Sequence, residues 1–122
     1  MDKKLQEKVD KILRSDYKVS FDDEGVTVEF WSPVGEDMPE YFRGETLREL
    51  AADAREAYEA FDADDHAAQI YHAMHYGTVD QQRFYAGMPE SLEDLLQDAK
   101  AIKRTLKDIV DKLEKAAKKE GK

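Results

Sequence analysis

The chain has 122 residues and a mass of 14.1 kDa, which suffices for one compact domain and is too little for two ordinary ones. It has no cysteine, which excludes disulfide frameworks, thiolate zinc sites and thiol nucleophiles. Acids outnumber bases by 28 to 19, for a formal net charge of -9, and no apolar run approaches the roughly 20 residues that span a bilayer. We therefore expect one acidic, cytoplasmic domain over residues 1–122 that does not bind membranes.

The first part of the chain predicts a helix followed by a β-hairpin. Residues 2–15 repeat apolar side chains every three or four positions, which is typical of a short amphipathic helix. Residues 17–21 and 26–31 instead alternate apolar and polar side chains, as strands do. Residues 22–25 between them supply turn formers, so we expect an antiparallel hairpin.

A short third strand is expected over Met38–Phe42, where the chain can return along the hairpin. Pro39 lacks a backbone donor and restricts this strand to a sheet edge or to the start of the strand. Because two strands alone are only marginally stable in water, a third strand would support the hairpin.

Two helices are expected in the middle of the chain. Thr46 and Glu49 have the spacing of a capping box, which predicts a helix over residues 47–60. The carboxylates of residues 62–65 suit the N-terminus of a second helix that runs to about Tyr76.

The segment that follows, residues 77–90, predicts a packed loop. Gly77 is expected to end the preceding helix in the left-handed conformation. Phe84, Tyr85 and Met88 are expected to anchor the loop to the core.

The last part of the chain predicts a long helix with Ser91 as its N-cap and a heptad seam roughly 40 Å long. The seam residues are Leu92, Leu95, Ala99, Ile102, Leu106, Ile109, Leu113 and Ala116. The N-terminal helix is too short to cover them all, so the middle helices or a second copy in a homodimer would cover the rest. The elements together predict an α+β domain, with an N-terminal helix, an antiparallel hairpin with a short third strand, two middle helices and a long C-terminal helix packed on one sheet face.

Charge is distributed unevenly along the chain. Residues 16–66 hold 16 acids and four bases, whereas residues 100–122 hold four acids and nine bases. This acidic middle disfavours direct binding to nucleic acid, because phosphates require a concentrated cationic surface. Two interpretations remain: a solvated face that keeps the protein soluble, or an acidic face that docks into a basic groove of another protein.

The residues expected to contact a cationic partner are carboxylates of the acidic middle and aromatic residues beside them. The carboxylates are Glu36, Asp37, Glu40, Glu45 and Glu56. Trp31 and Tyr41 would be the aromatic anchors, although aromatic residues on strands also commonly pack into a core.

Metal binding and catalysis are not expected. His72 and His75 lie one helical turn apart, but no third ligand is fixed by their spacing. Asp62, Asp64 and Asp65 resemble the start of a calcium loop that lacks the required Gly and Glu. No pattern marks a carboxylate as buried, so we assign no catalytic residue and no cofactor.

Three motifs carry a resemblance to a known group of proteins. They are residues 30–37 (FWSPVGED), 61–66 (FDADDH) and 89–102 (PESLEDLLQDAKAI). In these motifs the chain resembles small acidic proteins carried by conjugative and other mobile elements of gut Firmicutes, over roughly residues 17–117. The group has an alternating apolar strand after residue 37, and residues 38–41 (MPEY) break that alternation.

The resemblance implies carriage on a mobile element, where small acidic proteins often counter host defence as anti-restriction or anti-CRISPR factors, some by imitating the charge of nucleic acid. No functional residue carries over, because the group has no established site that matches these positions. We therefore expect a non-enzymatic acidic binding protein that inhibits a nucleic-acid-processing defence enzyme. A structural or regulatory homo-oligomer assembled through the C-terminal helix is the alternative.

Overall fold

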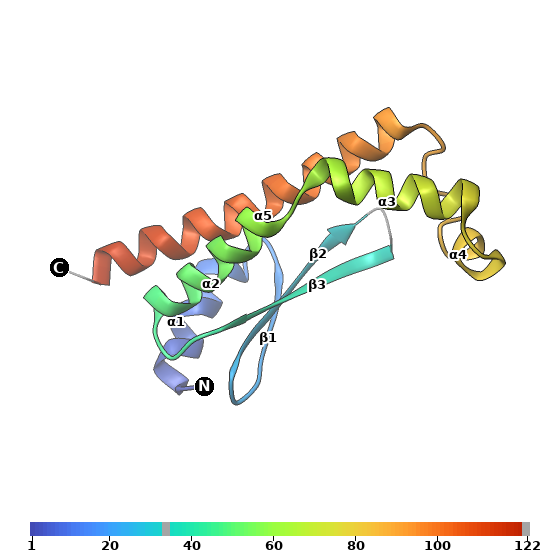
Figure 1. The fold of residues 1–122 in the computed structure, drawn as a ribbon. Helices are drawn as coiled ribbons and strands as arrows, with labels where there is room; N and C mark the ends of the chain where they lie inside the picture. The colour runs from blue at the N-terminus through green and yellow to red at the C-terminus, as the bar shows by residue number, and fades with distance from the viewer. Residues whose placement is uncertain (33–34, 121–122) are drawn as a thin grey trace.

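The computed structural model describes residues 1–32 and 35–120, and for residues 31–32 and 35–37 it describes the course of the strands but not the side chains. The elements are α1 (Lys3–Leu13), β1 (Lys18–Phe21), β2 (Gly25–Ser32), β3 (Gly35–Arg43), α2 (Leu47–Ala60), α3 (Ala63–Tyr76), α4 (Val79–Phe84) and α5 (Leu92–Glu120). The predicted α+β class is confirmed, and Figure 1 shows α2 and α3 following one another along α5. None of the described helices offers an apolar stretch of bilayer-spanning length.

The sheet has three antiparallel strands in the order β1-β2-β3. Val19 pairs with Val28 across β1 and β2, and Val28 pairs with Glu40 across β2 and β3. The expected third strand is therefore confirmed, and at Gly35–Arg43 it is longer than predicted. Pro39 lies on this edge strand, where a residue without a backbone N–H is tolerated.

The helices cover one face of the sheet, as predicted. Successive side chains of a strand point to opposite faces, so Val26, Val28 and Phe30 share the face that is buried against the helices. Thr27 and Glu29 lie between them and point to the other face, where both are half-buried. The alternation of apolar and polar residues thus decides which side of the hairpin meets α5.

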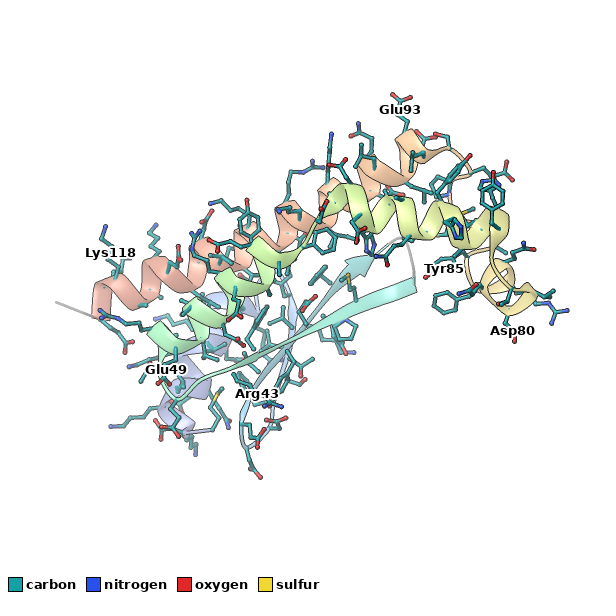
Figure 2. The ribbon with its side chains drawn as sticks, viewed as in Figure 1. Arg43, Glu49, Asp80, Tyr85, Glu93 and Lys118 are labelled. Atoms are coloured by element: carbon teal, nitrogen blue, oxygen red, sulfur yellow. The ribbon has the colours of Figure 1, made fainter. Side chains whose placement is uncertain are left out.

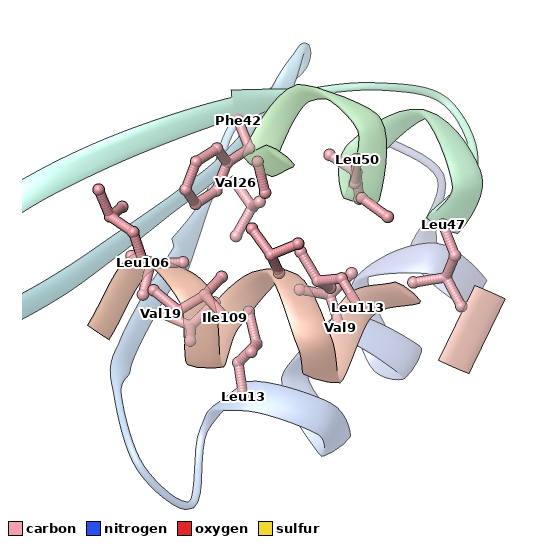
Figure 3. Close-up of a cluster of buried hydrophobic side chains, with 14 of the residues drawn as sticks. Val9, Leu13, Val19, Val26, Phe42, Leu47, Leu50, Leu106, Ile109 and Leu113 are labelled. Carbon is pink, nitrogen blue, oxygen red and sulfur yellow. The ribbon is translucent and has the colours of Figure 1, made fainter. Parts of the chain in front are cut away.

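The apolar seam of α5 is covered by the protein's own elements. Its members from Leu95 to Leu113 are each at most 2% exposed. The helices α2 and α3 pack along α5, and α1 and β2 also contact it. Figure 3 shows Leu106 and Ile109 of α5 among buried side chains of the strands and of α1. A homodimer through this seam would have to displace α2 and α3.

The ends of the seam differ from the heptad prediction. Leu92 is 47% exposed and Ala116 is half-buried, whereas Val110 and Ala117 are buried. The stripe drifts around α5 because 3.6 residues per turn do not match a repeat of 3.5. Leu92 begins the helix one turn before the first covered position.

Buried side chains form two clusters that share α5. The larger cluster joins α1, the sheet, α2 and the part of α5 from Ile102 onward. The smaller cluster joins Ala67 and Ile70 of α3 to Leu95 of α5, and Met88 closes it from the connection between α4 and α5. The molecule therefore has a mixed α/β end and a purely helical end.

The prediction of a loop over residues 77–90 is wrong in its centre, where Val79–Phe84 form α4. Thr78 and Gln81 make the reciprocal hydrogen bonds of a capping box: the Gln81 N–H donates to Thr78 Oγ1 at 3.2 Å, and the Thr78 N–H to Gln81 Oε1 at 2.9 Å. Phe84, expected as an anchor, is instead 64% exposed.

Gly77 does not adopt the left-handed conformation that was expected, since its φ of -81° and ψ of -175° are extended. The lack of space for a side chain explains the glycine at this position instead. A Cβ at this position would lie 2.5 Å from the carbonyl oxygen of Ala73 and 2.5 Å from Gln81 Oε1.

The other predicted caps are confirmed, with one change of partner. Thr46, Asp62 and Ser91 each accept a hydrogen bond from the backbone N–H three residues later, at 3.1 Å. The Glu49 carboxylate, however, accepts from the backbone N–H of Glu45 at 2.7 Å rather than from that of Thr46.

Substitution of two seam leucines tests whether the protein's own elements cover the apolar seam of α5. We expect Leu106→Ala to lower the free energy of unfolding by about 2–5 kcal/mol, because it leaves a cavity at a side chain that is 1% exposed. Leu92→Ala, at 47% exposure, should cost less than about 1 kcal/mol. Urea unfolding followed by circular dichroism measures both, and its midpoint should not depend on protein concentration. Equal losses, or a concentration-dependent midpoint, would contradict the covered seam.

Candidate acidic binding surface

Five carboxylates surround a hollow of about 580 Å³ at the mixed α/β end of the molecule. They come from the start of α1, from the β1–β2 turn, from the connection between β3 and α2, and from the first turn of α2. The lining residues are Met1, Asp2, Asp23, Glu24, Gly44, Glu45 and Glu49. Figure 2 shows Glu49 of α2 at this end, on the opposite side of the molecule from α4. We call this feature the acidic hollow.

Hydrogen bonds fix the N-terminus to the β1–β2 turn. The α-ammonium of Met1 donates to the carbonyl oxygen of Asp23 at 2.7 Å and to that of Asp22 at 3.2 Å. The Asp22 carboxylate accepts from the Tyr41 hydroxyl at 2.7 Å and from the Gly25 N–H at 2.9 Å. These bonds, with that from Tyr41 the strongest influence, hold the pKa of Asp22 below its usual value. The β1–β2 turn is thus held by the N-terminus and by Tyr41 of β3.

Gly44 lets the chain pass close to the start of α2. A Cβ at this position would lie 2.8 Å from the backbone nitrogen of Leu50 and 2.8 Å from the Cβ of Glu49. A larger residue would push the connection away from the helix, and with it the lining residue Glu45.

The carboxylates of Glu49, Asp53 and Glu56 lie along one face of α2, because they are four and three residues apart, and they span about 10 Å. Glu45 precedes the helix and its backbone N–H donates to the Glu49 carboxylate, so we group these four residues as the acidic stripe. Asp53 is half-buried and accepts from the backbone N–H of Arg43 at 2.8 Å, and the other three are exposed. This acidic stripe shares Glu45 and Glu49 with the acidic hollow, so the two form one continuous surface.

None of the ion pairs among the described residues includes a member of the acidic stripe. The counter-charges at the acidic hollow are the Met1 ammonium and Arg43, whose guanidinium is 3.6 Å from the Glu24 carboxylate with both side chains about 70% exposed. An exposed pair of this kind contributes little and is readily exchanged for another partner.

The carboxylates of α5 from Asp108 onward are paired instead. Arg55 of α2 and Glu114 of α5 form a bidentate ion pair, in which Arg55 Nε and Nη2 donate to the Glu114 carboxylate at 2.5 Å and 2.8 Å. Lys112 pairs with Asp16 and, at 3.1 Å, with Asp108. Asp108 also accepts from the Tyr17 hydroxyl at 2.5 Å, which is the main reason that the pKa of this aspartate is low. Arg55 of α2 and Lys112 of α5 therefore neutralise carboxylates along this part of α5.

The structure brings together two of the carboxylates that the sequence proposed for partner binding. Glu45 and Glu56 are exposed members of the acidic stripe. Glu40 is half-buried on the face of β3 that meets the helices, and burial raises its pKa. Tyr41 points to the opposite face, where the Arg43 guanidinium lies 5.4 Å from the centre of its ring. The side chains of Trp31, Glu36 and Asp37 lie outside the described part of the structure.

Sequence reasoning missed four of the five carboxylates that line the acidic hollow. They are Asp2, Asp23, Glu24 and Glu49. The turn signal at residues 22–25 and the capping box at Thr46 each position a carboxylate locally, but neither pattern indicates that the three segments meet. Only the packing of α1 and α2 against the hairpin brings them to one end.

The histidines lie at the helical end and contact aromatic rings. The centre of the His75 ring is 4.4 Å from the centre of the Tyr71 ring, and the centre of the His72 ring is 5.4 Å from the centre of the Tyr76 ring. Within residues 1–32 and 35–120, no group of three or more His, Cys, Asp or Glu side chains has the arrangement of a metal site.

Comparison with known proteins finds no matching family model, no matching curated protein and no matching solved structure.

The raised pKa of Glu40 predicts how stability depends on pH. Burial disfavours the charged carboxylate, so the folded state binds a proton more readily than the unfolded state, and stability falls as pH rises from about 4.5 through the folded pKa. We expect Glu40→Gln to raise the melting temperature at neutral pH and to lose that advantage below the unfolded pKa. The exposed residue Glu45 supplies the matched control Glu45→Gln, for which we expect little change. A gain that persists unchanged at low pH would contradict burial as its cause.

Proposed function

We propose that this protein is a non-enzymatic binding protein whose acidic hollow and acidic stripe dock onto a cationic groove of another protein. One observation carries the proposal. Three carboxylates of the stripe lie on one face of α2 and Glu45 just before it, and none of the four has a cationic partner among the described ion pairs, although other carboxylates of the chain are paired. Docking onto these four groups would break no internal ion pair.

The charge spacing of the acidic stripe supports a nucleic-acid-binding groove as the partner. The three carboxylates on α2 span about 10 Å, which corresponds to one charge per roughly 5 Å, whereas one strand of B-DNA carries one phosphate per 3.4 Å. Lysine and arginine side chains that hold phosphates can adjust to a difference of this size, because their heads move on flexible stems. The acidic hollow adds charge beside the stripe and widens the negative surface.

The partner class that fits this surface is a nucleic-acid-processing enzyme, and the action that follows is inhibition by occupation of its nucleic-acid groove. The resemblance to proteins of mobile elements favours defence enzymes, so the proposed role is that of an anti-restriction or anti-CRISPR factor. Long-range attraction between oppositely charged surfaces would raise the rate of association and make that rate sensitive to salt.

The homo-oligomer alternative has less support. The heptad seam on which it depended is at most 2% exposed from Leu95 to Leu113. Assembly would need a different surface or a rearrangement of α2 and α3.

A displacement assay tests the proposal. Labelled DNA or guide RNA is bound to each of a panel of restriction endonucleases and RNA-guided nucleases, and its release by this protein is followed by fluorescence anisotropy. We expect displacement from at least one enzyme, with an affinity that falls as salt is raised from about 50 to about 200 mM. Failure to displace nucleic acid from any member, or displacement independent of salt, would overturn the proposal.

Matched charge reversals locate the surface. Glu56 belongs to the acidic stripe, whereas Glu7 lies on the exposed side of α1. The variants Glu56→Lys and Glu7→Lys have the same net charge. We expect Glu56→Lys to weaken displacement about tenfold and Glu45→Lys with Glu56→Lys to weaken it further, with little effect of Glu7→Lys. Equal effects of Glu56→Lys and Glu7→Lys would mean that net charge alone is responsible.

A further inference from the structure

Four bases of α5 surround a pocket that opens between this helix and α2. The pocket has a volume of about 280 Å³, and its lining residues are Tyr58, Lys100, Lys103, Arg104 and Lys107. Tyr58 belongs to the last turn of α2, and the bases lie in the first half of α5. We call this feature the basic pocket, and Figure 1 shows α2 running beside α5.

The four bases lie on one face of α5. Lys100 and Arg104 are four residues apart, as are Lys103 and Lys107, and each of these pairs lies within one turn of the other. From Lys100 to Lys107 the cationic face is about 10 Å long. Four positive charges on so short a face form a concentrated site for an anion.

Helix stability does not account for this arrangement. Like charges three and four residues apart repel and destabilise a helix. The helix dipole favours cations only in the last turn, whereas Lys107 lies more than three turns before the end of α5 at Glu120. The later carboxylates Asp111 and Glu114 are instead paired with bases, as helix stability requires.

The fold holds one of the four bases in place. The ammonium of Lys103 donates to the carbonyl oxygen of Phe61 at 2.6 Å, and it lies 5.0 Å from the centre of the Tyr58 ring. Phe61 follows α2 directly, so Lys103 is fixed at the break between α2 and α3. An ammonium has three N–H donors, and this bond uses one of them. Lys103 is therefore preorganised and retains donors for a ligand.

The charges of the other bases are available to a ligand. Lys100 and Arg104 are exposed, and neither they nor Lys103 take part in an ion pair of the described residues. Lys107 pairs with Asp111 at 2.8 Å, with about half of each side chain exposed. An exposed pair of this kind is readily exchanged for a stronger anion.

We propose that the basic pocket binds a diphosphate or triphosphate group. The guanidinium of Arg104 can hold two phosphate oxygens at once, and the lysines supply point charges around the same group. The volume of about 280 Å³ lies just below the roughly 300–1,000 Å³ of pockets that enclose a whole ligand. The phosphates therefore fill the pocket, and the rest of the ligand stays outside it.

A long strand of nucleic acid fits the basic pocket less well. On α5 the next acid after Lys107 is Asp108, and Asp111 follows one turn later on the cationic face. On α2 the exposed residue Glu59 follows Tyr58. Phosphates beyond the pocket would meet these carboxylates, so a short group with several charges is favoured over an extended polyanion.

The basic pocket is separate from the acidic stripe. Tyr58 is two residues from Glu56, and residues at this spacing point to different sides of a helix. Anion binding at the pocket and docking through the acidic stripe are therefore independent, and either can fail without the other.

Calorimetric titration of the full chain tests the site. The probes are pyrophosphate, ADP, orthophosphate, sulfate and a 20-nucleotide single-stranded DNA, at about 50 mM salt and equal ionic strength. We expect pyrophosphate to bind at least tenfold more tightly than orthophosphate or sulfate. ADP and pyrophosphate then distinguish a nucleotide from an inorganic polyphosphate as the source of the group. Equal binding of pyrophosphate and sulfate would reduce the site to an adventitious ion only, and tighter binding of the DNA would assign it to nucleic acid instead.

Matched double variants locate the binding. Lys100→Gln with Arg104→Gln removes two exposed bases of the pocket, and Lys115→Gln with Lys119→Gln removes two exposed bases farther along α5. We expect the first pair to weaken pyrophosphate binding at least tenfold and the second pair to change it less than twofold. Equal weakening by both pairs would mean that net charge alone attracts the anion, which would exclude the basic pocket.

Melting temperatures give a second readout. Without ligand, the variant Lys100→Gln with Arg104→Gln should melt above the unchanged protein, because repulsion among the four bases is relieved. Pyrophosphate should raise the melting temperature of the unchanged protein and leave that of this variant where it is. A variant that is less stable without ligand would show that the bases serve the fold, and the proposal would then be wrong.

Discussion

Burial of one apolar stripe along α5 organises the whole structure. The helix has 29 residues, about 43 Å, whereas α1 has 11 and α2 and α3 have 14 each. None of these three is long enough to cover the stripe alone, so α2 and α3 lie one after the other along it, and α1 and the sheet complete the cover. The carbonyl of Phe61, at the break between α2 and α3, accepts from Lys103 of α5 at 2.6 Å. An elongated molecule with two different ends follows from this single requirement.

The same arrangement sorts the carboxylates. Cations flank the buried stripe of α5, where Lys107 and Lys112 pair with Asp111 and Asp16, and Arg55 of α2 joins Glu114. Carboxylates on the far side of α2 are out of their reach and stay unpaired. A chain with nine more negative than positive charges thus concentrates its unbalanced charge away from residues 100–120 of α5. Unpaired charge of this kind acts on other molecules over about 8–10 Å at ordinary salt.

The two ends of α5 differ in the surface that they present. At the mixed α/β end the acidic surface is polar and surrounds a hollow. At the helical end, the apolar side chains of Tyr76, Val79, Phe84 and Leu92 are exposed on helices that also carry carboxylates. Exposed apolar area favours association, whereas negative charge at the same end opposes association between copies of the protein.

The sequence by itself determined the order of the elements, the hairpin, the caps and the apolar stripe, because these depend on periods of 3.6 and 2 residues and on capping groups within a few positions of one another. The capping box of Thr78 and Gln81 also has this local spacing, although the glycines and proline of the segment predict a loop. The acidic hollow could be predicted from the sequence only to a small extent. Asp2, Asp23 and Glu49 come together only because α1, the β1–β2 turn and α2 pack at one end. Likewise, Glu40 turns toward the helices and Phe84 toward solvent. The tertiary structure decided these positions, since burial and charge pairing depend on neighbours that are distant along the chain.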